Sequence, residues 1–69
     1  MRRVVCPGSF DPIHKGHLEI IMRAASLFDE VVVAVSTNPV KKYRFSEAER
    51  IEMITEAISG FSGIVVEGM

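Results

Sequence analysis

The sequence predicts an α/β fold in which a parallel sheet is joined by helices in the order β-α-β-α-β. Three observations support this prediction. Residues 31–35 read VVVAV, an apolar run without alternation that is typical of a central strand covered on both faces. Shorter runs of β-branched residues lie near both ends of the chain. Two segments with apolar residues at helical spacing separate the three runs, as in one half of a doubly wound, Rossmann-like sheet.

The first strand is expected at Val4–Cys6, and because this run does not alternate, we expect it to be buried on both faces. Pro7 and Gly8 are expected to end it. A helix is then expected from about residue 16 to residue 28, followed by the break at Asp29 and Glu30. Its buried stripe is expected to combine Leu18, Ile21, Ala25 and Phe28 with the flanking Ile20, Ala24 and Leu27.

The central strand at residues 31–35 leads into a polar loop, STNPVKKYRF, in which Pro39 disfavours helix. Ser46 and Glu49 have the spacing of a capping box, which predicts the start of the second helix. Gly60 is expected to act as the C-cap of that helix, and residues 64–66 are expected to form the third strand. The buried stripe of the second helix is expected to contain Ala48, Ile51, Ile54 and Ile58.

The 69 residues are expected to belong to one domain. Parallel crossovers are right-handed in about 98% of cases, so two crossovers in the same direction place both helices on one face of the sheet. The other face would then be apolar and uncovered, which soluble proteins rarely tolerate. We therefore expect residues 1–69 to be the N-terminal part of a longer domain, and to be unfolded or aggregated if isolated.

Composition narrows the function classes. The net charge is −1, from 8 basic and 9 acidic residues, which gives no indication of a nucleic-acid or anionic-membrane partner. No apolar stretch approaches the roughly 20 residues of a membrane span. Cys6 is the only cysteine, so an internal disulfide is excluded and the residue is expected to be a small buried apolar group. A reducing cytoplasm is the expected location.

The segment PGSFDPIHKGH, residues 7–17, carries the chemistry. It connects a strand to a helix N-terminus, where unpaired N–H groups and the helix dipole favour phosphate. Ser9 offers a hydroxyl and an N–H, and Gly8 and Gly16 allow close approach. His14 and His17 are three residues apart and are therefore expected on one face, where Nε2–H groups can donate to phosphate.

Other interpretations of the same residues stay open at this point. The histidines could be a solvated helix start or could bind zinc, although zinc usually takes at least three protein ligands. Asp11 is interpreted as structural, holding its own loop through Asx-type bonds. Lys41 lies in a polar Lys-Lys pair that is typical of solvated surface, and Arg44 and Arg50 receive no role. The segment matches neither a Walker A loop nor GxGxxG.

The stretch G-S-F-D-P-I-H-K-G-H resembles the signature of the nucleotidyltransferase superfamily, in which H-x-G-H lies at the start of the first helix. Within that superfamily the chain is most similar to the bacterial phosphopantetheine adenylyltransferase family. Four motifs carry the similarity: C-P-G-S-F-D-P, F-D-E-V-V-V-A-V, N-P-x-K-K and F-S-x-x-E-R-x-x-M-I. It runs through all 69 residues and corresponds to about the first two-fifths of the usual chain of that family.

The resemblance implies adenylyl transfer from ATP to 4′-phosphopantetheine, giving dephospho-coenzyme A and pyrophosphate, with Mg²⁺ accompanying ATP. It implies that Ser9 lies between the two substrates and that, with Phe10, it touches the nucleotide. His17 would contact the ATP phosphates and stabilise the transition state, and His14 would also contact phosphate. Lys41 would reach the acceptor's phosphate. A cytoplasmic homo-oligomer, a hexamer, is also implied.

Two features depart from the family pattern. His14 occupies a position that is commonly Thr in the family, although His is usual there in the wider superfamily. The later nucleotide-binding segments of the family have no counterpart before Met69. Nicotinate mononucleotide adenylyltransferase, which has Pro-Pro-His-Lys where this chain has N-P-V-K-K, is an alternative, as is a noncatalytic nucleotide-binding module.

Overall fold

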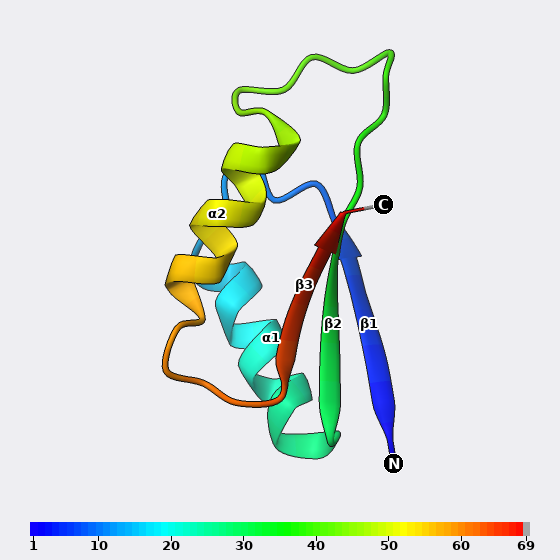
Figure 1. Ribbon diagram of the computed structural model, residues 1–69, viewed down its shortest axis with the longest axis vertical. Coiled ribbons are helices and arrows are strands. Elements are labelled where there is room, and N and C mark those ends of the chain that lie inside the picture. Colours follow the sequence, from blue (N-terminus) through cyan, green and yellow to red (C-terminus); the bar gives the residue numbers. More distant parts are fainter. Residues whose placement is uncertain (69) are drawn as a thin grey trace.

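A computed structural model describes residues 1–68 and has the expected element order. The three strands form one parallel sheet in the order β1-β2-β3, with Cys6, Val33 and Val66 in register across it. The α/β prediction is therefore confirmed, while the expected domain end, Met69, lies outside the described residues. The elements in Figure 1 are β1 (Arg3–Gly8), α1 (Lys15–Leu27), β2 (Glu30–Val35), α2 (Glu47–Ala57) and β3 (Ile64–Gly68).

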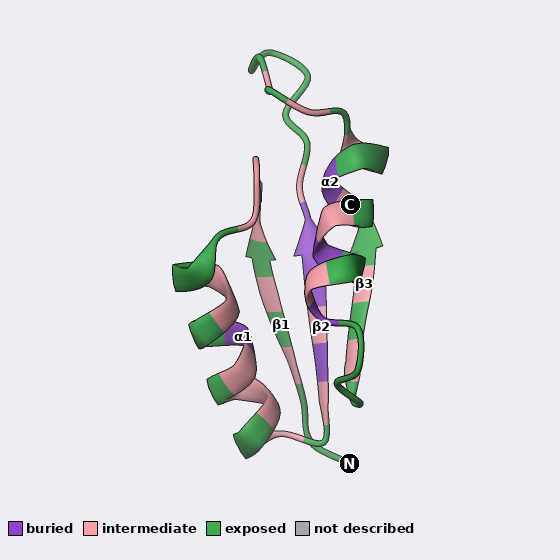
Figure 2. Cartoon of the chain, turned by 90° about the vertical axis from the view of Figure 1, so that its left-hand side faces the viewer, coloured by how far each residue is buried: buried purple, intermediate pink, exposed green. Residues whose placement is uncertain are grey.

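Both helices cover the same face of the sheet (Figures 1 and 2), as the strand order and right-handed crossovers require. β2 supplies the centre of the core, because Val31, Val33 and Val35 alternate toward the helices and are fully buried. Ile21 of α1 and Ile54 of α2 pack against them. This arrangement fixes the position of the loops that leave the carboxyl ends of β1 and β2.

The opposite face of the sheet is not covered by the described residues. Val5 and Val65 are in register with Val32 on this face, and they are 55% and 39% exposed. The expectation that Val4–Cys6 is buried on both faces is therefore wrong for this part of the chain. The reason is geometric: successive side chains of a strand point to opposite faces, and both helices lie on one of them.

β1 does not end at Pro7 and Gly8, as its composition predicted, but continues through them. Pro7 lacks an N–H and is therefore tolerated on an edge strand, where one side of the backbone needs no partner. Gly8 pairs with Val35, and its carbonyl accepts a hydrogen bond from the Ser36 N–H at 2.9 Å. The first loop thus leaves the sheet level with the end of β2.

The helices begin close to where they were expected, but their buried faces differ in part. In α1, Ile20 and Leu27 are exposed rather than part of the stripe. In α2 the capping box of Ser46 and Glu49 is confirmed, while Ala48 is exposed. The C-cap residue is Ile58 rather than Gly60, and the chain turns at Gly60 with φ +91°. Each helix buries a narrower stripe because it meets the sheet from one side only.

No helix within residues 1–68 is long and apolar enough to span a membrane.

Candidate active site

Two connections meet at the carboxyl edge of the sheet. One is residues 9–14, between β1 and α1, and the other is residues 36–46, between β2 and α2. Figure 1 shows both above the tips of the strands, the second rising further from the sheet. The carboxyl edge is where ligands bind in open α/β sheets. All of the predicted site residues lie on these connections or on the first turn of α1.

His14 and His17 build the start of α1. His14 is the N-cap residue, and its Nδ1 accepts a hydrogen bond from the Gly16 N–H at 3.0 Å. His17 Nδ1 accepts from the His14 N–H at 3.1 Å, completing a capping box made of two imidazoles. The rings are stacked, with centroids 3.7 Å apart. The expectation that both side chains lie together is confirmed.

This capping geometry fixes the tautomer of both rings. Because each Nδ1 accepts a backbone N–H, the proton of the neutral imidazole resides on Nε2. Nε2–H is therefore the free donor of both His14 and His17. The helix start thus presents two oriented donors at the positive end of its own dipole.

The charges at the two helix starts differ. The first turn of α2 carries Glu47 and Glu49, which oppose the positive end of its dipole, whereas the first turn of α1, Lys15–Leu18, contains no acidic residue. Desolvation, with repulsion from a charged His14 ring as the smaller cause, lowers the pKa of His17 below its ordinary value of 6.5. At neutral pH the His17 ring is therefore neutral and keeps its cap.

The lowered pKa of His17 has a direct test in an NMR titration of the ring carbons of the complete protein. We expect a midpoint below 6.5, because burial disfavours the charged form. The unfolded chain then binds the proton more readily than the folded one. The neutral His17 ring therefore stabilises the fold fully at pH values above its pKa in the unfolded chain. This stabilisation is lost as the pH falls through the lower pKa of His17 in the folded protein.

His14→Asn provides the control for this titration. Asn is a good N-cap residue, so the helix start is retained while the second ring is removed. The midpoint of His17 should then rise toward 6.5, because the repulsion and part of the burial are gone. An unperturbed midpoint in the wild type, or no change in the variant, contradicts the stacked arrangement.

Phe10 and the two glycines support the histidines. The Phe10 ring is buried, 5% exposed, and contacts the His17 ring edge-to-face with centroids 4.9 Å apart. A Cβ on Gly8 would lie 2.9 Å from the Phe10 ring, and one on Gly16 would lie 2.9 Å from the His14 ring. The predicted close approaches at both glycines are thus made by side chains of the same segment.

Asp11 joins the two connections. Its carboxylate accepts hydrogen bonds from the backbone N–H groups of Arg44, at 2.6 Å, and Phe45, at 2.9 Å. The prediction of a structural role is confirmed, but the predicted mechanism was wrong. The bonds span more than thirty residues instead of closing an Asx turn within the loop, because the folded sheet brings residues 44 and 45 over the first loop.

Arg50 is the residue that the sequence analysis missed. It is 1% exposed on α2, and its guanidinium donates to the carbonyls of Ser9, Ser36 and Phe45. Among residues 1–68 the ion pair present is Arg3 with Glu30, so the partners of Arg50 are neutral. Its position four residues before Ile54 was the available signal, because residues four apart share one face of a helix.

Lys41 lies apart from the histidine cluster along the chain, on the exposed part of the second connection. Its backbone N–H donates to the Asn38 carbonyl at 3.0 Å, which closes a turn that contains Pro39. The structure thus brings Ser9, Phe10, His14 and His17 into one segment, and it presents Lys41 from the neighbouring connection. Among the described residues, no hydrogen bond or ion pair joins the Lys41 side chain to that segment.

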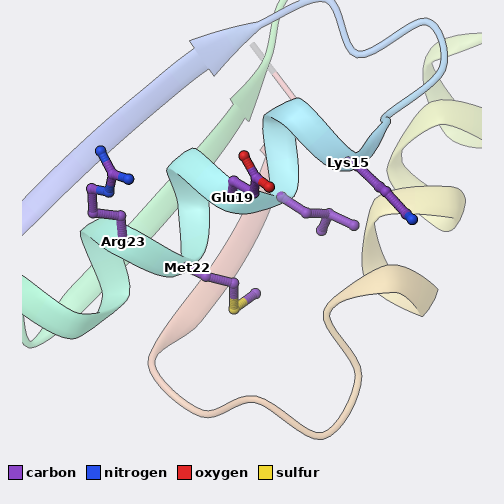
Figure 3. A pocket seen from close by; sticks show the side chains of 5 residues that line it. Lys15, Glu19, Met22 and Arg23 are labelled. Carbon is purple, nitrogen blue, oxygen red and sulfur yellow. The ribbon is translucent and has the colours of Figure 1, made fainter.

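An open hollow lies elsewhere on the surface. Figure 3 shows it along α1, with a volume of about 610 Å³. It is wide open and contains neither of the histidines, so we do not regard it as the reaction site. Within residues 1–68, no three His, Cys, Asp or Glu side chains are grouped as metal ligands. The residues that line the hollow are Lys15, Leu18, Glu19, Met22 and Arg23.

A parallel sheet whose first loop enters a histidine-capped helix defines a Rossmann-like domain of the nucleotidyltransferase type. The chain belongs to the cytidylyltransferase-like family, which matches residues 5–68. The resemblance to phosphopantetheine adenylyltransferases is also confirmed. The chain is 70% identical over 67 residues to the phosphopantetheine adenylyltransferase of Pseudarthrobacter chlorophenolicus, covering 97% of this chain and 40% of the relative.

A second relative is the phosphopantetheine adenylyltransferase of Renibacterium salmoninarum, with 68% identity over 100% of this chain and 43% of the relative. The chain thus spans about two-fifths of the length of these curated relatives. Among solved structures, the NadR protein in complex with NR has a TM-score of 0.85 and 28% identity, covering 96% of this chain and 19% of that one. A bifunctional NMN adenylyltransferase/ADP ribose pyrophosphatase from Francisella tularensis has a TM-score of 0.84, also with 28% identity, covering 100% and 23%.

Proposed function

We propose that this chain forms the phosphate-binding part of an enzyme that transfers the adenylyl group of ATP to 4′-phosphopantetheine. The observation that carries the proposal is the start of α1, where two Nε2–H donors lie at the positive end of the helix dipole, with no acidic side chain in the first turn. This arrangement suits a polyphosphate. The choice of 4′-phosphopantetheine as the acceptor rests on the names of the relatives at 68–70% identity.

The reaction requires no nucleophile from the protein. An oxygen of the acceptor phosphate attacks the α-phosphorus of ATP and forms the new P–O bond. The bond from the α-phosphorus to the bridging oxygen of the β-phosphate breaks, and its electron pair leaves with pyrophosphate. Catalysis then consists of orientation, which can contribute up to roughly 7–11 kcal/mol, and of stabilising charge on the phosphoryl oxygens.

Each predicted residue has a role in this proposal. His17 donates Nε2–H to the α-phosphoryl oxygens as they gain charge, and His14 donates to the neighbouring phosphate. Ser9 contacts both the acceptor phosphate and the nucleotide. Phe10 acts through its backbone and by supporting the His17 ring, because its own ring is buried. Lys41 holds the acceptor phosphate from the second connection.

Mg²⁺ belongs to the proposal as the ion that accompanies ATP. It would neutralise charge on the triphosphate. Asp11, the carboxylate of the first loop, already accepts two backbone hydrogen bonds and is not assigned to the metal. In this proposal, the ligands of Mg²⁺ are therefore the oxygens of the ATP phosphates and not side chains of residues 1–68.

Nicotinate mononucleotide is the competing acceptor. The structural similarity to an NMN adenylyltransferase favours a related class of acceptor, a pyridine mononucleotide. Pyrophosphate release by the complete protein, measured with each acceptor in turn, separates the two. We expect release with 4′-phosphopantetheine and background release with nicotinate mononucleotide. The reverse result contradicts the proposal.

The proposal also includes a cytoplasmic homo-oligomer, which by the same resemblance is a hexamer. Sedimentation of the complete protein tests the oligomeric state.

A further inference from the structure

Arg50 holds the two connections of the site together. Its Nη1 donates to the Ser9 carbonyl at 2.9 Å, on the first connection, and to the Ser36 carbonyl at 3.1 Å, on the second. Its Nη2 donates to Thr37 Oγ1 at 2.7 Å, and its Nε donates to the Phe45 carbonyl at 3.2 Å. One planar group therefore fixes four acceptors whose relative positions no single strand or helix determines.

The contacts of Arg50 extend to Lys41 through Tyr43. The guanidinium carbon lies 4.2 Å from the centre of the Tyr43 ring, and the Tyr43 hydroxyl accepts the Asn38 N–H at 2.8 Å. Asn38 in turn accepts the Lys41 N–H through its carbonyl, at 3.0 Å, and the Val40 N–H through Oδ1, at 3.0 Å. A continuous set of contacts thus runs from Arg50 to the turn that carries Lys41.

The energetics indicate that Arg50 is not there for stability alone. A charge that is 1% exposed and paired only with neutral acceptors carries a desolvation cost that an apolar side chain of similar size would not. The planar guanidinium of Arg50 fixes the positions of several acceptors at once, because its nitrogens set both distances and angles. An apolar side chain cannot do this.

We propose that Arg50 is a positioning residue that sets the location of Ser9 relative to Lys41, and hence of the acceptor phosphate relative to ATP. This inference rests on the proposed function. A displacement of the reacting groups by about 1 Å can cost roughly 100-fold in rate. Arg50 itself touches no substrate in this account.

The test is a double-mutant cycle in the complete protein, with kcat/KM for 4′-phosphopantetheine as the readout. Arg50→Met and Arg50→Lys should each lower this value by about 10- to 100-fold. Arg50→Lys is not expected to restore kcat/KM, because lysine keeps the positive charge but lacks the planar guanidinium group. Lys41→Ala should cost at least about five-fold less in the Arg50→Met background than in the wild type, because the two residues act on one phosphate.

Two further variants keep the test decisive. Tyr43→Phe removes the hydroxyl that holds Asn38 while leaving the ring on Arg50, so it serves even if Arg50→Met fails to fold. It should lower kcat/KM for the acceptor by about three- to ten-fold, an effect that disappears in the Lys41→Ala background. Arg23→Met, at an exposed position of α1, is the control and should change kcat/KM less than two-fold.

Hydrogen exchange of the Asn38, Val40 and Lys41 amides supplies a readout that does not depend on turnover. These amides should exchange at least about ten-fold faster in Arg50→Lys and Tyr43→Phe than in Arg23→Met. Unchanged exchange, or additive losses in the cycle, overturns the role of Arg50. Absence of turnover by the wild type with 4′-phosphopantetheine instead overturns the proposed function, and the exchange data still decide whether Arg50 orders the connection.

Discussion

His17→Ala is expected to lower kcat for adenylyl transfer by at least about 100-fold in the complete protein, the scale of removing one donor to a developing oxyanion. The ring is positioned for this role by the His14 N–H on its Nδ1 side and by Phe10 against its edge. Removing it eliminates the Nε2–H donor that faces away from the cap. Steady-state rates of pyrophosphate release measure the effect.

His17→Asn is the matched control for this loss. The Asn side-chain oxygen lies near the position of Nδ1 and can still accept the His14 N–H, but it offers nothing at the position of Nε2. We expect His17→Asn to melt close to the wild type and to be as inactive as His17→Ala. If either variant keeps turnover within a few-fold, His17 has no catalytic role. If the wild type binds ATP but releases no pyrophosphate with either acceptor, the protein is better explained as a noncatalytic nucleotide-binding module.

Asp11→Ala is expected to lower both stability and activity. The backbone N–H groups of Arg44 and Phe45 lose their acceptor, and Phe45 N–H is partly buried, so unfolding should become easier by about 1–3 kcal/mol. Because the bonds join the first connection to the second, kcat/KM should also fall by about ten-fold or more. Denaturant titration and acceptor kinetics of the complete protein measure the two effects.

Asp29→Ala gives the comparison that Asp11→Ala needs. Asp29 also accepts a backbone N–H through its carboxylate, from Arg2 at 2.8 Å, but it lies at the amino end of the strands, opposite the site. Its loss should affect stability modestly and kcat/KM less than two-fold. Equal losses of activity in both variants would mean that Asp11 acts only through stability.

Much of the fold follows from local patterns. The apolar run of β2 and the Ser46 capping box predict their elements because burial and helix capping act over a few residues. The single-sided burial of β1 was predicted only in part. The apolar run at residues 4–6 indicates that both faces of the strand are covered, whereas the direction of the crossovers indicates that only one face is. Within the described residues the crossovers decide the outcome, because both helices lie on the face of the sheet opposite Val5.

The site was predictable where its chemistry is contiguous in the sequence. The pairing of His14 and His17 follows from their spacing at a helix start. The bonds from Asp11 to the Arg44 N–H and from Arg50 to the Ser9 carbonyl join residues 33 and 41 positions apart, and nothing in the local sequence specifies such partners. The burial of the Phe10 ring could not be predicted from the sequence either. It depends on a left-handed backbone conformation at Phe10, with φ 51°, which places the ring against Gly8.

The central claim is that triphosphate binds at the start of α1 with His17 Nε2–H facing the α-phosphorus. A crystal structure of the complete protein with a nonhydrolysable ATP analogue tests it most directly. We predict the α-phosphate within hydrogen-bonding distance of His17 Nε2, with Nδ1 still accepting the His14 N–H. A triphosphate bound away from this helix start, with the His17 ring turned from it, would contradict the account.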